Sequence, residues 1–429
     1  MMATLVIVLV GTLVVLLLGL RVGIAIALVG ILCTIFLLSP PQPGVAGELL
    51  WNATKSYYLT SLPLFVFMAE MLLIGGVADR AYRAAVDWLG HVPGGAAHST
   101  VAASVGFAAM CGSSVASAAA LGTMVAPQLT KHGYSPRLVF GTLAAGGTLG
   151  ILIPPSLALI LYGALTGESI GHLFMAGVIP GLLIAALFSV TIVIWSLIRP
   201  SDAPRMPKVP LRRKIVSLLA LMPALGVIGT VLGGIYTGYF SPTESAGFGS
   251  CLAVLIALAS RKLTWSKIMG AARSAVETTT MIMVIVAAAS LLTYVLGLLR
   301  VPGLLSEAIA ASGLSPNLVL IGIAALYVFL GCFIESISLV VLTVPILVPA
   351  LTVLKVDLIW FGVFVVLLIE IALLTPPVGL NLYVLKRVPA GQTLDDIIVG
   401  SIPFIFALIA GLALLMIWPG LATWLPSRM

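Results

Sequence analysis

Long apolar segments follow one another along almost the whole chain, separated by short polar stretches. At 61% hydrophobic and 8% charged residues, a chain of 429 residues carries more apolar surface than a soluble core can bury, so its solvent is lipid. We therefore predict an all-α polytopic membrane protein. The apolar segments lie at roughly 3–20, 22–38, 62–78, 98–131, 138–165, 173–198, 215–234, 246–260, 276–298, 318–354, 359–385 and 398–418.

Two of these segments have a length that fits neither one membrane crossing nor two. Residues 98–131 and 318–354 exceed the roughly 20 residues of one crossing, yet they leave no room for a second crossing and a loop. The first contains the small polar run CGSSVAS, and the second contains GCFIESISL. Irregular backbone is tolerated at membrane depth only where protein surrounds it. We therefore predict two re-entrant hairpins whose polar tips lie inside the protein.

The distribution of basic residues supports these hairpins. With the N-terminus outside and both hairpins returning to their own side, 17 of the 21 Lys and Arg residues fall inside, which is a strong positive-inside bias. Making only one hairpin a full crossing reverses every later loop and removes the bias. This threading places the C-terminus outside as well. It also accounts for the net charge of +7 without a nucleic-acid partner.

A basic, Pro-rich stretch at 199–214, RPSDAPRMPKVPLRRK, divides the chain on the inner side. A plain positive-inside loop is the favoured interpretation, and a patch that binds lipid or a partner is the alternative. Residues 79–91 and 260–275 are amphipathic and predict helices lying at the same interface. Residues 3–20 predict a retained first helix, because they have no basic start and no small-residue cleavage site.

Pairs of adjacent prolines interrupt two apolar segments, at 154–155 and at 376–377. Proline breaks a helix because it lacks an N–H group and clashes with the preceding turn. The spacing along the chain between the two pairs is the same as the spacing between Ser113 and Glu335 at the hairpin tips. This shared spacing predicts two inverted repeats. The first repeat is 1–198, which contains the N-terminal scaffold helices, hairpin 98–131 and a broken helix at about 138–165. The second repeat is 215–429, which contains hairpin 318–354 and a broken helix at about 359–385.

Inverted repeats with broken helices are the architecture of secondary transporters, which bind substrate and ions where the repeats meet. A broken helix frees carbonyl groups for Na⁺ and N–H groups for an anion, and hydroxyl groups add the oxygen ligands that hard cations prefer. For both candidate sites, close packing of small and polar residues is the alternative. The first predicted Na⁺ site comprises Gly112, Ser113, Ser114, Ser117, Gly146, Gly150 and Pro154, and the second comprises Glu335, Ser336, Ser338, Thr375, Pro376 and Gly379. The predicted substrate contacts are Ser113, Ser114, Glu335, Ser336 and Asn381.

Other acidic residues in apolar surroundings have open roles. For Glu70 and Glu370, structural hydrogen bonding and a proton or cation role are equally compatible with the sequence. Glu244, in SPTESAG, predicts a helix N-terminal capping box.

Three alternatives to a partnered transporter have unequal support. A membrane-embedded enzyme lacks support, since no helix carries a His/Glu metal pair. A purely structural scaffold subunit would leave the inverted repeats unexplained. A stand-alone dicarboxylate or Na⁺/H⁺ exchanger is the main alternative.

Five motifs in order resemble those of the large membrane subunit of tripartite ATP-independent periplasmic (TRAP) transporters, the DctM-like permeases. They are GSSVASAAALGTMVAP, GTLGILIPPS, SPTESAG, GCFIESISLVVLTVPILVP and EIALLTPPVGLNLYV. The resemblance covers nearly the whole chain. It implies a Na⁺-coupled importer of an organic acid in the bacterial inner membrane, with both termini in the periplasm and the basic loop in the cytoplasm.

The same resemblance implies partners, a mechanism and ion ligands. A periplasmic binding protein delivers the organic anion, a small four-helix membrane subunit braces the scaffold within the membrane lipid, and the domain with both hairpins moves as an elevator. No organic cofactor, and no metal besides Na⁺, is implied. The family's Na⁺ sites match Ser113, Ser114, Gly150 and Pro154 in one half and Glu335, Thr375, Pro376 and Gly379 in the other. Many relatives carry Asp where Glu335 stands.

Overall fold

The computed structural model describes residues 11, 14–15, 20, 22–37, 44–55 and 57–429, and within them every regular element is helical. The predicted all-α polytopic fold is confirmed. The helices of the first part are α2 (Val22–Phe36), α3 (Val45–Thr54), α4 (Ser61–Ile74), α5 (Val77–Leu89), α6 (Gly95–Cys111), α7 (Ser114–Lys131), α8 (Pro136–Leu152), α9 (Leu157–Thr166) and α10 (Ile170–Ile198). They are followed by α11 (Leu211–Leu219), α12 (Met222–Tyr236), α13 (Pro242–Ala259), α14 (Trp265–Leu298), α15 (Val301–Ala311), α16 (Pro316–Gly331), α17 (Ser336–Val353), α18 (Leu358–Leu374), α19 (Leu380–Lys386), α20 (Leu394–Ile417) and α21 (Gly420–Thr423).

Five of the described helices, and the segment Pro136–Thr166 that α8 and α9 form together, are long and apolar enough to cross a membrane; these six spans become eight when each of two bent pairs counts as one span. The bent pairs are α4 with α5, at 63°, and α11 with α12, at 46°. The chain is therefore a multi-pass membrane protein. Residues 3–20, predicted as a first helix, fall largely outside the described residues.

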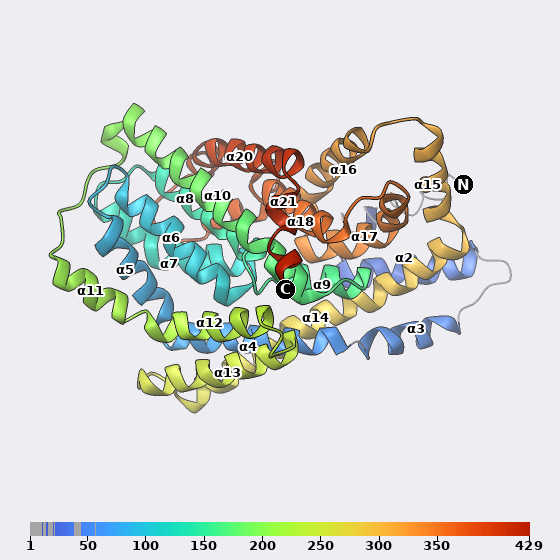
Figure 1. Cartoon of the computed structure of the whole chain (residues 1–429), viewed down its shortest axis with the longest axis horizontal. Helices are drawn as coiled ribbons and strands as arrows, with labels where there is room; N and C mark the ends of the chain where they lie inside the picture. The colour runs from blue at the N-terminus through green and yellow to red at the C-terminus, as the bar shows by residue number, and fades with distance from the viewer. Residues whose placement is uncertain (1–10, 12–13, 16–19, 21, 38–43, 56) are drawn as a thin grey trace.

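The helices form two layers, which lie one above the other in Figure 1. In one layer, α13 packs against α4 and α12, and α14 packs against α2, α3 and α4. In the other layer, α8 packs against α6, α7 and α20, and α18 packs against α16 and α20. The second layer contains both pairs of helices that correspond to the predicted hairpins, as well as both helices interrupted at a proline pair.

Each segment that was expected to be a hairpin consists of two helices joined by a short tip. Helices α6 and α7 are joined by residues 112–113, and α16 and α17 are joined by residues 332–335. The helix that ends at Leu152 resumes at Leu157, and the helix that ends at Leu374 resumes at Leu380. The helix breaks thus coincide with the two proline pairs.

The spacing between the two proline pairs also relates the ends of whole helices. Shifted along the chain by that spacing, both ends of α7 fall on the ends of α17, and both ends of α8 fall on the ends of α18. In space the halves cross over: α9 of the first half packs on α17 of the second, while α19 of the second half packs on α7 of the first. These matches support the division into two repeats, which stays a prediction.

Side chains that cap helix N-termini explain where several of these helices begin. Ser156, directly after the first proline pair, accepts a hydrogen bond from the backbone N–H of Leu159 at 3.2 Å and so starts α9. Ser241 and Glu244 form a reciprocal capping box at the start of α13, which confirms the prediction for Glu244. The start of α9 after the first break and the start of α13 are therefore set by local capping.

Residues 260–275 do not form the separate interfacial helix that was predicted, and the short helices α3 and α15 were not predicted. Instead of a separate interfacial helix, α14 begins at Trp265 and continues without a break to Leu298. Its basic residues are compatible with a continuous span because long Lys and Arg side chains extend from a helix toward the polar interface. Helices α3 and α15 have 10 and 11 residues, too few for a crossing, so a search for membrane-length segments passes over them.

Candidate ion and substrate site

The first hairpin tip lies directly on the first helix break. The carbonyl oxygen of Gly112 accepts a hydrogen bond from the backbone N–H of Leu157 at 3.3 Å. Gly112 has a φ of +64°, and a Cβ atom built there would lie 2.7 Å from the carbonyl oxygen of Pro155. Only glycine provides both the left-handed conformation and the close backbone approach. The glycine thus holds the tip against the break at the proline pair.

Next to this contact, oxygen atoms surround Gly150 on α8. A Cβ atom built at Gly150 would lie 2.6 Å from Ser117 Oγ and 2.8 Å from the carbonyl oxygen of Ser113. The Ser117 hydroxyl is buried, and it has no hydrogen-bond partner within the described part of the chain. Its lone pairs are available to a water molecule or an ion. These oxygens are of the type that a hard cation prefers.

Gly146, one turn before Gly150, faces another helix. A Cβ atom built there would lie 2.4 Å from Ser104 Oγ of α6. Ser104 is buried and its hydroxyl has no partner among the described residues. Ser104 was not singled out from the sequence, where it is one of many small residues in its segment. Pro154 is buried in the break itself.

At the second tip, the carboxylate of Glu335 caps α17. Its Oε2 atom accepts hydrogen bonds from the backbone N–H groups of Ile337, at 3.1 Å, and Ser338, at 3.3 Å, and from the Ser338 hydroxyl at 3.4 Å. The three contacts use one carboxylate oxygen. Because a carboxylate has about four acceptor positions, the group keeps lone pairs for a further partner.

The two tips meet at one small cavity. Its lining includes Gly112, Ser113 and Ser114 of the first tip together with Glu335 and Ser336 of the second. Four of the five predicted substrate contacts are therefore neighbours in space. The cavity has a volume of about 30 Å³, and a cavity needs roughly 10–15 Å³ to hold one water molecule, so it has room for an ion or one or two water molecules rather than an organic acid.

The fifth predicted substrate contact, Asn381, joins the two halves beside this cavity. Its Nδ2 group donates hydrogen bonds to Ser114 Oγ at 2.8 Å and to the carbonyl oxygen of Ala144 at 3.3 Å. Asn381 is fully buried, and its Oδ1 atom has no partner among the described residues. The side chain therefore ties α19 to the first hairpin and to α8, and it does not line the cavity.

The other members of the second predicted set lie at the second break, away from that cavity. The Thr375 hydroxyl donates to the carbonyl oxygen of Ile371 at 2.6 Å. The carbonyl oxygens of Thr375 and Pro376 each lie 3.7 Å from Cys332 Sγ, which brings the second tip against the second break. Gly379, with a φ of +53°, starts α19. Cys332 was missed in the sequence, since a single Cys in an apolar segment carries no signal of its own.

The two breaks differ in their surroundings. The first proline pair is buried, whereas both prolines of the second pair are exposed. The structure thus divides the second predicted set: Glu335 and Ser336 lie at the cavity shared with the first tip, while Thr375, Pro376 and Gly379 lie at a more open break.

Two acids whose roles were left open have different surroundings. Glu70 Oε1 accepts a hydrogen bond from Ser274 Oγ at 2.7 Å, which links α4 to α14. Glu370 of α18 is fully buried, and neither carboxylate oxygen has a partner among the described residues. The structural role is therefore supported for Glu70.

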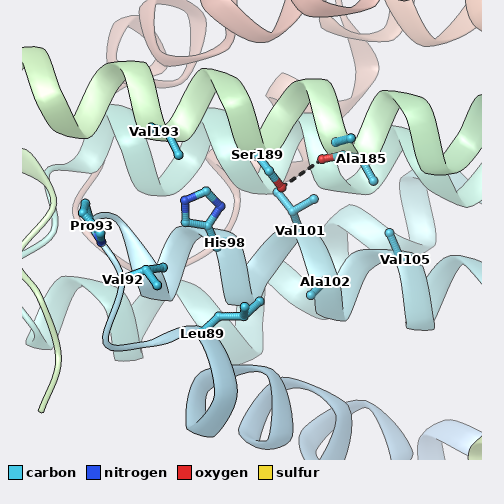
Figure 2. Close-up of a pocket in the computed structure, with 11 residues that line it drawn as sticks. Leu89, Val92, Pro93, His98, Val101, Ala102, Val105, Ala185, Ser189 and Val193 are labelled. Carbon is cyan, nitrogen blue, oxygen red and sulfur yellow. Dashed lines mark hydrogen bonds between the residues drawn. The ribbon is translucent and has the colours of Figure 1, made fainter. Parts of the chain in front are cut away.

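A larger cavity, of about 620 Å³, lies between α6 and α10 and does not belong to this site. Figure 2 shows the His98 ring among apolar side chains, with Val193 and Pro93 nearby. The Ser189 hydroxyl at its edge already donates to the carbonyl oxygen of Ala185 at 3.0 Å. None of the predicted site residues lines this cavity, and its apolar walls offer no cluster of oxygen ligands.

The fold resembles that of a known transporter. The YdaH transporter of Alcanivorax borkumensis aligns with a TM-score of 0.59 and 15% identity over 84% of this chain and 85% of the other. At this identity the likeness concerns the fold alone.

Sequence comparison is more specific. The C4-dicarboxylate TRAP transporter large permease protein of Pseudomonas aeruginosa is 34% identical over 92% of both chains. The ectoine TRAP transporter large permease protein of Halomonas elongata is 33% identical over 86% of both, and the sialic acid counterpart of Vibrio cholerae is 30% identical over 95% of both. These relatives are transporter permeases, so the chain is a transport protein and not an enzyme. The sequence model of the family 'Tripartite ATP-independent periplasmic transporter, DctM component' matches residues 9–421, and the chain therefore belongs to this family of large permease subunits.

Proposed function

We propose that this chain is the large subunit of a Na⁺-coupled importer that carries an organic acid across the bacterial inner membrane by an elevator movement. One observation carries the proposal: the tips of both hairpins meet at one cavity, between the two halves and against the first broken helix. Secondary transporters bind their ions and substrates at this kind of junction.

The charge at the cavity favours cation coupling. Glu335 is the one charged residue in the described lining. An organic acid that approached this carboxylate would be repelled unless a cation lay between them. Ser117 Oγ, the carbonyl oxygen of Ser113 and the free lone pairs of Glu335 are oxygen ligands for such cations. We infer that Na⁺ binds first and that the organic anion then bridges the tips.

The small size of the cavity and the arrangement of the helices in two layers favour a moving domain. Since the cavity of about 30 Å³ is too small for an organic acid, the tips have to separate before the substrate enters. Both tips and both breaks lie in one of the two layers in Figure 1, while α2, α4, α13 and α14 form the other. The layer with the tips is the proposed moving part, and the other layer is the proposed frame.

The proposed partners are a small four-helix membrane subunit and a periplasmic substrate-binding protein. Relatives are named for C4-dicarboxylate, sialic acid and ectoine transport, so the substrate class proposed here is a small organic acid. The experiment is uptake of labelled carboxylates into proteoliposomes holding this chain and its small subunit, under an inward Na⁺ gradient, with and without the binding protein. Uptake that needs both Na⁺ and the binding protein is expected. Uptake by this chain alone, indifferent to the binding protein, would instead establish a stand-alone exchanger.

Removing an oxygen ligand at either tip or break should weaken Na⁺ coupling. Ser113→Ala and Thr375→Ala are each expected to raise the Na⁺ concentration for half-maximal uptake several-fold. Ser113 also caps α7, and loss of a cap costs about 1 kcal/mol. Ser135→Ala is the matched control, because Ser135 caps α8 but does not line the cavity. An unchanged Na⁺ dependence in both site variants would contradict the assignment of these ligands.

A further inference from the structure

A third cavity, of about 500 Å³, lies where three helix junctions meet, and none of the hairpin-tip residues lines it. The junctions are the bend between α4 and α5, the bend between α11 and α12, and the turn from α13 to α14. Four cationic side chains line it: Arg80, Arg83, Arg213 and Lys262. All of them fall on the inner side in the positive-inside threading.

The positive charge in this cavity is only partly balanced. Asp87 is the one carboxylate in its described lining, and its Oδ1 atom already pairs with Arg213 Nε at 3.2 Å. Three cations therefore have no carboxylate in the lining to balance them. They are Arg80, Arg83 and Lys262.

Backbone contacts hold these cations in place without using up their donors. The Arg80 guanidinium donates to the carbonyl oxygen of Gly75 at 2.8 Å, and Arg83 Nε donates to that of Asp79 at 3.3 Å. The Lys262 ammonium lies over Gly76, where a Cβ atom would approach its Nζ to 3.3 Å. A guanidinium has five N–H donors, so both arginines retain donors for a phosphate group.

An apolar groove of about 490 Å³ continues from the basic cavity along α12 and α13. Arg80 and Ser260 line both spaces, so the two are adjacent. The rest of the groove is lined largely by aliphatic side chains, including Val227 and Leu255. Helix α13 is long and apolar enough to span the membrane, which places the groove in hydrocarbon and the basic cavity at its polar edge.

We propose that an anionic phospholipid binds here, with its phosphate in the basic cavity and an acyl chain in the groove between α12 and α13. A free phosphate ion would leave the apolar groove empty. A zwitterionic lipid carries no net negative charge to balance the three cations. Basic pockets between helices at the inner face suit anionic headgroups. Helix α11 then forms one wall of the lipid site, and this inference is independent of the proposed Na⁺ coupling.

The headgroup part is tested by native mass spectrometry on the full-length chain in detergent, with dioleoyl phosphatidylglycerol or dioleoyl phosphatidylcholine added at equal concentration. One phosphatidylglycerol adduct is expected to be retained preferentially. Arg83→Gln with Lys262→Gln should weaken its retention at least tenfold, since each basic residue near the surface contributes about a factor of five. The matched control is Arg205→Gln with Lys208→Gln, which removes the same charge from exposed linker positions that do not line the cavity.

The acyl-chain part is tested by filling the groove. Gly226 lines it, and a Cβ atom built there has nothing within 4 Å, so Gly226→Leu occupies the groove without disturbing the helix packing. Gly229→Leu is the control, because Gly229 has the same open surroundings on α12 but does not line the groove. We expect only Gly226→Leu to reduce phosphatidylglycerol retention. Unfolding midpoints near that of the wild type establish that all four variants are folded.

Three results would overturn the proposal. The first is equal retention of phosphatidylglycerol and phosphatidylcholine by the wild-type chain. The second is equal loss in the pocket variants and their controls. The third is complete displacement of the lipid by millimolar inorganic phosphate, which would make this a site for the free anion.

Discussion

Gly150→Ala is expected to lower Na⁺-driven uptake at least fivefold. The added methyl group would lie 2.6 Å from Ser117 Oγ and 2.8 Å from the carbonyl oxygen of Ser113, in the space where these oxygens converge. One of the contacts is backbone, so the tip or α8 has to shift. Overpacking of this kind costs about 1–3 kcal/mol. If this whole cost weakens Na⁺ binding, the Na⁺ affinity falls roughly 5- to 150-fold.

The measurement is the initial rate of uptake into proteoliposomes at increasing Na⁺ concentration. Gly106→Ala is the matched control, since Gly106 lies on α6 of the same hairpin and nothing lies within 4 Å of a Cβ atom built there. Alanine is a better helix former than glycine, so the α8 helix itself does not lose stability through the substitution. Wild-type uptake by Gly150→Ala would contradict a cation site at this position and favour simple close packing.

The elements that the sequence predicted best are those with a strong local signal. Proline pairs exclude a continuous helix wherever they fall, and both breaks are where the pairs are. The spacing between the halves, noted from a few special residues, extends to both ends of α7 and α17 and of α8 and α18. Gly/Ser-rich and Glu-containing runs inside apolar segments predicted both tips.

The sequence did not predict that the second tip would lie at the cavity beside the first break, as well as against its own break. Ser113 and Glu335 were both predicted as substrate contacts, but as cation ligands they were assigned to separate Na⁺ sites, because each was considered with the broken helix of its own half. In the structure they line one cavity, since α9 crosses onto α17 and α19 crosses onto α7. Such crossing is decided by packing between distant segments. The hydrogen bond from Asn381 to Ser114, 267 residues away, belongs to the same class of contact.

Local patterns also do not report the environment of a break. Both proline pairs have similar apolar flanks in the sequence, yet the first is buried and the second is exposed. The difference follows from what covers each break: Gly112 and the first tip lie on the first one, while the second is approached by Cys332. A sequence comparison of the halves therefore makes them more alike than they are.

Glu335→Gln is expected to raise the Na⁺ requirement of uptake at least tenfold while leaving the fold intact. The amide oxygen of glutamine still accepts hydrogen bonds from the backbone N–H groups of Ile337 and Ser338, so the cap of α17 is largely kept. What is lost is the negative charge at the cavity. A unit charge about 4 Å from a cation contributes about 4 kcal/mol at an effective dielectric constant of 20, so a tenfold effect needs only part of it.

Two further variants separate charge from capping. Glu335→Asp keeps the charge and is a favoured capping residue, so its Na⁺ requirement should lie between those of the wild type and Glu335→Gln. Glu244→Gln removes a capping carboxylate at α13, where no tip is involved, and should leave the Na⁺ requirement unchanged. If Glu335→Gln instead leaves the Na⁺ requirement at the wild-type value, as Glu244→Gln does, then Glu335 is a helix cap and the cation site depends on the serines of the first tip. We expect the Na⁺ requirement to rise from Glu to Asp to Gln at position 335. This order would show that a carboxylate faces the cation where the two halves meet.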